Sequence, residues 1–147
     1  MQNAEIKNVK PLLQQHTVSG SALIADFLGW ENYGDGKTYK FPNLYPIYNI
    51  DDEENTGWIS EQISKAEFDT RWDWLMPVVD KIMRTKIGDG AEYVEYPYLR
   101  TFGMLNEETK NPMVRFNGFQ VFEAETLIEA TFLAVVDFLE WWSKADR

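Results

Sequence analysis

The chain has no cysteine and a single histidine among its 147 residues. Without cysteine there are no disulfides, thiolate zinc sites or thiol nucleophiles, and a reducing compartment is favoured. Any site of the Ser-His-Asp type would depend on His16, which lies in a polar stretch without periodicity. We therefore expect no metal centre and no cofactor, and the sequence assigns no catalytic residue.

Long apolar segments are also missing, because no run approaches the roughly 18 residues that a membrane-spanning helix needs. The first residues, Met-Gln-Asn-Ala-Glu-Ile-Lys, do not form a charged segment followed by an apolar one. These absences predict a cytoplasmic protein that does not span a membrane.

Basic residues are scarce: 14 Lys and Arg stand against 24 Asp and Glu, a net charge of −10. Residues 51–80 are the most acidic stretch, with nine acids and two bases. Binding nucleic acid through its phosphates needs a basic surface, so direct binding of nucleic acid is not expected. The charge suits a basic partner, including a nucleic-acid-binding protein that an acidic surface would block. Solubility alone also explains it.

Four consecutive acids, Asp51, Asp52, Glu53 and Glu54, begin this acidic stretch. A calcium loop of the EF-hand type that began at the first of them would need Gly at its sixth position and Glu at its twelfth. Thr and Gln occupy those positions. The pattern predicts a solvated acidic loop, and we treat its four acids as candidate partner-binding residues.

Aromatic residues are abundant, with six Trp, seven Tyr and nine Phe. Many belong in the core, and any surplus on the surface indicates a binding site. Two tryptophans, Trp74 and Trp141, fall outside the apolar faces expected for their helices. We expect them to meet a partner unless a second packed layer covers them.

The periodicity predicts two main helices, over 70–86 and 126–144. In the first, the apolar stripe consists of Trp72, Leu75, Val79, Ile82 and Met83. A capping box is expected at the start of each, with Asp replacing Glu in the first. These expected boxes are Thr70-x-x-Asp73 and Thr126-x-x-Glu129.

The rest of the chain predicts short elements. Residues 1–18 read as an irregular N-terminal arm, and 19–28 as a short helix ended by Gly29. Strands are expected over 37–41, 46–50, 91–96, 98–104 and 113–122, with a hairpin signal at Asn117-Gly118. Residues 58–68 fit either a helix or a strand. The order predicts a single α+β domain over 19–147, with the two main helices packed on one face of a small antiparallel sheet.

Three glutamates, Glu123, Glu125 and Glu129, gather where the last helix should begin. A helix dipole favours carboxylates there, which is reason enough for their position. With further acids from the strands they would also suit a small metal-dependent hydrolase. The candidate further acids are Glu92, Glu95, Glu107 and Glu108.

Three segments resemble a known group of proteins. They are Leu23-Ile-Ala-Asp-Phe-Leu-Gly-Trp30, Trp72-Asp-Trp-Leu-Met-Pro-Val-Val-Asp-Lys-Ile82 and Ile128-Glu-Ala-Thr-Phe-Leu-Ala-Val-Val-Asp-Phe-Leu-Glu-Trp-Trp142. The chain is similar here to small proteins of bacteriophages and prophage-bearing genomes of the Bacteroidetes type, and the Trp-Asp-Trp-Leu-Met-Pro-Val-Val string is the specific part. The resemblance implies an origin in a phage or mobile element, and it assigns no activity and no functional residue.

Three hypotheses follow for the function. The leading one is a small acidic, non-catalytic accessory protein that binds a host protein. The second is the metal-dependent hydrolase built on the clustered carboxylates. The third is a structural homo-oligomer in which Trp74 or Trp141 meets its symmetry mate.

Overall fold

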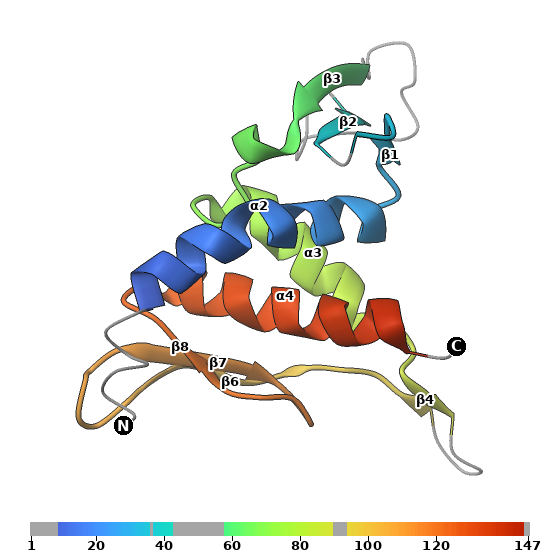
Figure 1. The fold of residues 1–147 in the computed structure, drawn as a ribbon. Coiled ribbons are helices and arrows are strands. Elements are labelled where there is room, and N and C mark those ends of the chain that lie inside the picture. Colours follow the sequence, from blue (N-terminus) through green and yellow to red (C-terminus); the bar gives the residue numbers. More distant parts are fainter. Residues whose placement is uncertain (1–8, 36, 43–57, 90–93, 146–147) are drawn as a thin grey trace.

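The computed structural model describes residues 9–35, 37–42, 58–89 and 94–145. Within them, helices and short antiparallel strands are mixed, which confirms the α+β class (Figure 1). The helices are α2 (Val9–Phe27), α3 (Trp72–Met83) and α4 (Leu127–Lys144), with a 3-10 turn η1 (Ile63–Lys65). The strands are β1 (Glu31–Asn32), β2 (Thr38–Pro42), β3 (Trp58–Gln62), β4 (Gly88–Asp89), β5 (Val94–Glu95), β6 (Leu99–Leu105), β7 (Pro112–Phe116) and β8 (Phe122–Glu123).

The described strands form separate sheets instead of the single sheet that the sequence predicts. Their orders are β1-β2-β3, β4-β5 and β6-β7-β8, and every pairing is antiparallel. Each sheet pairs strands that follow one another in the chain, and α3 separates the first sheet from the others. Strand pairing therefore stays local, which the alternation pattern could not reveal.

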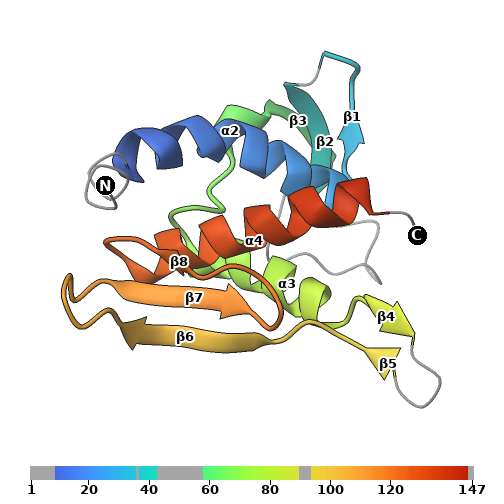
Figure 2. The same ribbon diagram turned by 60° about the horizontal axis from the view of Figure 1, so that its bottom comes forward.

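Helix α4 lies at the centre of the molecule. The β6-β7-β8 sheet covers one side of it, α2 and α3 lie against its other sides, and β1-β2-β3 is at the far end beyond α2 (Figures 1 and 2). Its buried residues are Ala130, Thr131, Phe132, Ala134, Val135, Val136, Phe138 and Leu139. A helix that is apolar on nearly all of its sides is buried by neighbouring helices and strands. The expected N-cap at Thr126 is confirmed, since its hydroxyl accepts a hydrogen bond from the Glu129 amide at 3.3 Å. The reciprocal half of the capping box is replaced, because the Glu129 carboxylate accepts from the Thr126 hydroxyl.

Helix α2 begins at Val9, so the expected irregular arm is wrong from residue 9 onward, and residues 1–8 lie outside the described ones. Pro11 suggested a break, but it lies in the first turn, where a backbone N–H would have no partner within the helix. The expected stop at Gly29 is confirmed. Gly29 has φ +80°, and its amide donates to Asp26 O while the Trp30 amide donates to Ala25 O. This is the Schellman ending of a helix.

Helix α3 buries Leu75, Val79 and Ile82 as the sequence predicts, but its first turn buries Trp74 in place of Trp72. Trp74 is only 8% exposed, whereas Trp72 is 36% exposed. The ring of Trp74 packs edge-on against Phe68 at 5.2 Å and Phe41 at 6.5 Å. Segments from the β1-β2-β3 side thus cover the first turn of α3. Of the two alternatives for Trp74, the structure thus shows the packed layer that covers the ring.

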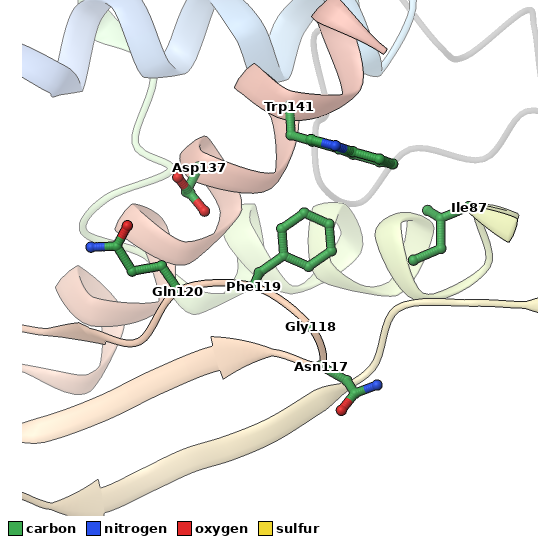
Figure 3. Close-up of a pocket in the computed structure, with 7 residues that line it drawn as sticks. All are labelled: Ile87, Asn117, Gly118, Phe119, Gln120, Asp137 and Trp141. Carbon is green, nitrogen blue, oxygen red and sulfur yellow. The ribbon is translucent and has the colours of Figure 1, made fainter. Parts of the chain in front are cut away.

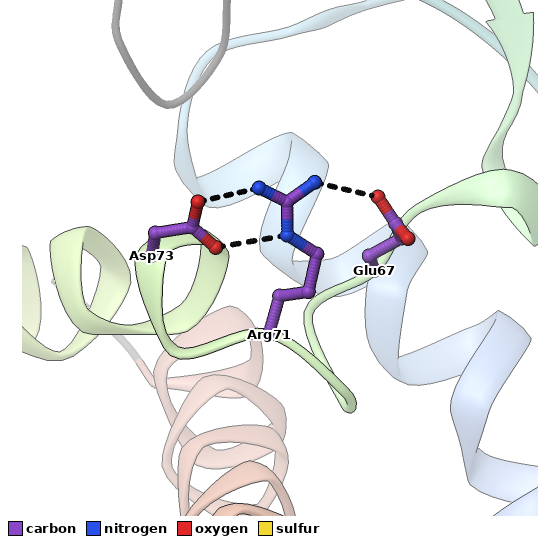
Figure 4. A network of polar contacts seen from close by, with 3 residues as sticks. All are labelled: Glu67, Arg71 and Asp73. Atoms are coloured by element: carbon purple, nitrogen blue, oxygen red, sulfur yellow. Dashed lines mark hydrogen bonds and ion pairs between the residues drawn. The ribbon is translucent and has the colours of Figure 1, made fainter.

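The start of α3 also lacks the expected capping box. Its N-cap residue is Arg71, which makes no side-chain cap. The Arg71 guanidinium instead pairs with Asp73 through two hydrogen bonds and with Glu67 through an N–O contact of 3.2 Å (Figure 4). All three side chains are about half exposed, so this network contributes little to the free energy of unfolding.

Candidate functional site

A hollow of about 520 Å³ lies between the last turns of α4 and the connection from β7 to β8. Its lining residues are Ile87, Asn117, Gly118, Phe119, Gln120, Asp137 and Trp141 (Figure 3). They come from three parts of the chain: the segment after α3, the β7–β8 connection and α4. The hollow is open to solvent, as a site for part of a larger molecule would be.

Local sequence rules explain how these side chains meet. Asp137 and Trp141 are four residues apart in α4, so they share one face of the helix. On the other side, the chain turns sharply at Gly118, which has φ +85°, and the Phe119 amide donates to Phe116 O at 3.0 Å. This is the turn that Asn117-Gly118 predicts. It brings Phe119 under Trp141 (Figure 3).

The aromatic wall of the hollow is continuous with the core. Phe119 meets Trp141 edge-on at 5.3 Å and the buried Phe138 edge-on at 5.2 Å. Trp141 lies 5.8 Å from Phe138 and remains 41% exposed. The wall is therefore held in place from behind while one indole stays accessible.

Asp137 supplies the charge of the hollow. Burial, and to a lesser extent the nearby carboxylate of Glu140, raises the pKa of its carboxyl. At the rim, the Asn117 side-chain oxygen accepts a hydrogen bond from Arg100 at 3.2 Å. The hollow thus combines one partly desolvated carboxylate, side-chain amides and an exposed indole, a set suited to recognition.

The glutamates proposed for a hydrolase do not converge. Glu123 accepts hydrogen bonds from Asn106 at 2.9 Å, Thr109 at 2.8 Å and Asn111 at 3.4 Å, and so braces the β6–β7 turn. Glu129 accepts a hydrogen bond from the Thr126 hydroxyl at 2.7 Å.

The remaining acids of that hypothesis give it no support either. Glu125, Glu107 and Glu108 are exposed. Glu92 and the Glu95 side chain lie outside the described part of the chain. No group of three or more potential metal ligands occurs among the described residues. The metal-dependent hydrolase therefore has no structural basis in this part of the protein.

The predicted partner-binding residues have three different outcomes. Trp141 lines the hollow, Trp74 lies in the core, and the acids of residues 51–54 lie outside the described residues. Sequence reasoning missed Asp137 and Phe119. The signal for Asp137 was its four-residue spacing from Trp141, whereas nothing in the sequence indicates that Phe119 folds back under the helix.

A second accessible apolar surface lies where the start of α3 meets β6. Its residues are Trp72, Met76, Phe102, Met104 and Leu105, all more than a third exposed. The rings of Trp72 and Phe102 meet edge-on at 6.0 Å. These five side chains are apolar, so they offer contact area with little chemical selectivity.

Two findings are negative, one on membrane-spanning helices and one on similarity to known proteins. Within the described residues, α2, α3 and α4 are each too short or too polar to cross a membrane. The chain matches no family model, no curated protein and no solved structure.

Proposed function

We propose that this is a small, non-catalytic binding protein that recognises another protein through the hollow around Trp141. The observation that carries the proposal is the exposed Trp141 indole, fixed against Phe119 and set one helical turn from a partly desolvated carboxylate. Tryptophans that fill well-packed contacts supply much of the binding energy in protein interfaces.

The charge of the chain favours a basic partner. At a net charge of −10, the protein attracts positively charged surfaces over a distance of about 10 Å at ordinary salt concentrations. Such attraction speeds association and selects partners more than it strengthens the final complex. A nucleic-acid-binding protein of the host is a partner of this kind.

The cellular setting is part of the same proposal. The absence of cysteine is consistent with the reducing cytoplasm. The origin in a phage or mobile element rests on the resemblance of three segments alone, of which the most specific forms α3. An accessory protein that modulates a host factor fits both features.

Affinity capture with matched variants tests the proposal. Tagged wild type, Trp141→Ala and Trp72→Ala would be incubated with a host-type bacterial lysate, and retained proteins would be quantified by mass spectrometry. Trp72 is the control, since it is a similarly exposed tryptophan outside the hollow. We expect a partner that the wild type and Trp72→Ala retain equally and that Trp141→Ala retains at least tenfold less.

The same capture experiment would be repeated at several salt concentrations. Retention should fall when the salt concentration is raised, because screening weakens attraction between accessible charges. Circular dichroism would establish that the variants are folded. Equal retention by Trp141→Ala and wild type would refute the proposed site.

A further inference from the structure

We infer that the hollow is a site for a guanidinium group, supplied by an arginine side chain of the bound protein. In this arrangement the guanidinium stacks on Trp141 and pairs with Asp137. The inference rests on the proposed function and adds the chemical class of the group that is recognised.

The first argument is the spacing of the two groups. Side chains four residues apart on a helix have their Cβ atoms about 5–6 Å from each other, so Asp137 and Trp141 can contact one planar group together. A guanidinium within about 6 Å of an indole centroid is attracted by the electron-rich face of the ring. Its in-plane N–H groups stay free to donate to a carboxylate.

The second argument is the unbalanced charge of Asp137. In the described part of the chain no Lys or Arg forms an ion pair with this carboxylate. The carboxylate is half-buried, and Glu140 adds a second negative charge nearby. Arg100 donates its hydrogen bond to the lining residue Asn117. A cation from outside would supply the missing counter-charge.

The third argument concerns hydrogen-bond direction. The two strongest acceptors that α4 and the β7–β8 connection bring together are the Asp137 carboxylate and the Gln120 side-chain oxygen (Figure 3). A guanidinium has five donors and no acceptor, so it matches such a set better than a carboxylate or a carbonyl group would. It is also more weakly hydrated than an ammonium group, which lowers the cost of entering a partly buried site.

A titration of the 147-residue chain followed by ¹H–¹⁵N NMR tests this inference. The probes are N-acetyl-arginine amide and its citrulline counterpart, which keeps the shape but lacks the charge. The Trp141 indole signal is identified by its loss in Trp141→Phe. We expect this signal and the Phe119 and Gln120 amides to shift with arginine, at a dissociation constant at least fivefold lower than with citrulline.

Charge variants and a third probe complete the design. Asp137→Asn should make the arginine and citrulline dissociation constants equal within twofold, whereas Glu107→Gln, an exposed acid in the β6–β7 turn, should leave the fivefold preference unchanged. Equal affinity of wild type for arginine and citrulline would overturn the cation site. Tighter binding of N-acetyl-lysine amide than of the arginine probe would overturn the choice of guanidinium.

The two proposals can fail separately. If a partner is retained through Trp141 but the arginine preference is absent, the binding function stands and the guanidinium site falls. If Trp141→Ala retains the partner fully, the proposed function itself fails, whatever the small probes do.

Discussion

At the scale of single residues, Glu123 connects β8 to the turn between β6 and β7 through its side chain. It is half-buried and receives hydrogen bonds from three side chains of the turn between β6 and β7. In Glu123→Gln, one acceptor oxygen becomes an NH₂ group that faces donors. We expect a loss of about 1–3 kcal/mol in the free energy of unfolding, measured by urea denaturation. Glu107→Gln, at an exposed acid of the same turn, should change it by less than about 0.5 kcal/mol.

Asp137 gives a prediction about pH. Because burial raises the pKa of its carboxyl in the folded state, the folded protein holds this proton to a higher pH than the unfolded chain does. The contribution of Asp137 to the free energy of unfolding therefore decreases as the pH rises from the pKa of this carboxyl in the unfolded chain to its higher pKa in the folded protein. The carboxylate of Glu140 acts in the same direction, and the other polar side chains that line the hollow, Asn117 and Gln120, are uncharged.

Replacing Asp137 by Asn removes this dependence. Asp137→Asn should melt at a higher temperature than wild type at pH 7, with a gain of up to about 0.5 kcal/mol. The gain should be smaller at pH 4 than at pH 7, because a larger fraction of wild-type Asp137 is protonated in the folded state at the lower pH. Differential scanning calorimetry at both pH values measures this, and a gain that grows toward low pH would contradict it.

At the scale of elements, the contact between α2 and α4 depends on Gly20. A Cβ atom at this position would lie 2.6 Å from Val136 Cγ2 and 3.1 Å from Phe132 Cζ. In Gly20→Ala, the gain of about 1 kcal/mol in helix propensity opposes an overpacking cost of about 1–3 kcal/mol. The branched Val136 side chain has few alternative rotamers, so we expect the cost to prevail.

The expected net effect of Gly20→Ala is a destabilisation of about 1 kcal/mol in thermal or urea unfolding. The neighbouring Ser19 is exposed, so Ser19→Ala gains propensity without a clash and should leave stability unchanged or slightly higher. Equal effects of the two substitutions would show that the helices do not approach closely at Gly20.

The two tryptophans at the start of α3 provide a matched pair. Trp74→Ala should lower the free energy of unfolding by about 3–5 kcal/mol, since it empties part of a cluster with Phe41 and Phe68. Trp72→Ala should cost less than about 1 kcal/mol, because the side chain is already 36% exposed. Urea denaturation measures both, and a larger loss for Trp72→Ala would contradict the described face of α3.

Elements with local signals could be predicted from the sequence, and their relative positions could not. The Thr126 N-cap, the Gly29 stop and the Asn117-Gly118 turn each depend on a few adjacent residues, and each is present. The face of α3 depends on what covers its first turn, which is set by Phe41 and Phe68 from other segments. For the same reason, Trp141 could be identified as a surface candidate while Phe119 beneath it could not.

At the scale of the whole molecule, one continuous core links the sheets and helices. Buried residues from α2, β2, α3, β7 and α4 belong to the same cluster, including Ile24, Tyr39, Leu75, Val114 and Phe132. We expect a single cooperative unfolding transition, with near-ultraviolet and far-ultraviolet circular dichroism giving the same midpoint. Two separated midpoints would show that the β1-β2-β3 region unfolds independently.

The central position of α4 has a consequence for how the chain folds. This helix comes after every element it packs against, and its contact with α2 joins Gly20 to Val136, 116 residues apart. Closing so long a loop reduces the entropy of the chain, and this loss comes before the contacts between α2 and α4 can stabilise the closed state. The apolar faces of α2 and α3 that contact α4 therefore remain exposed to solvent until α4 packs against them. We therefore expect refolding to be slower than the formation of each helix alone, and aggregation during refolding to increase with protein concentration.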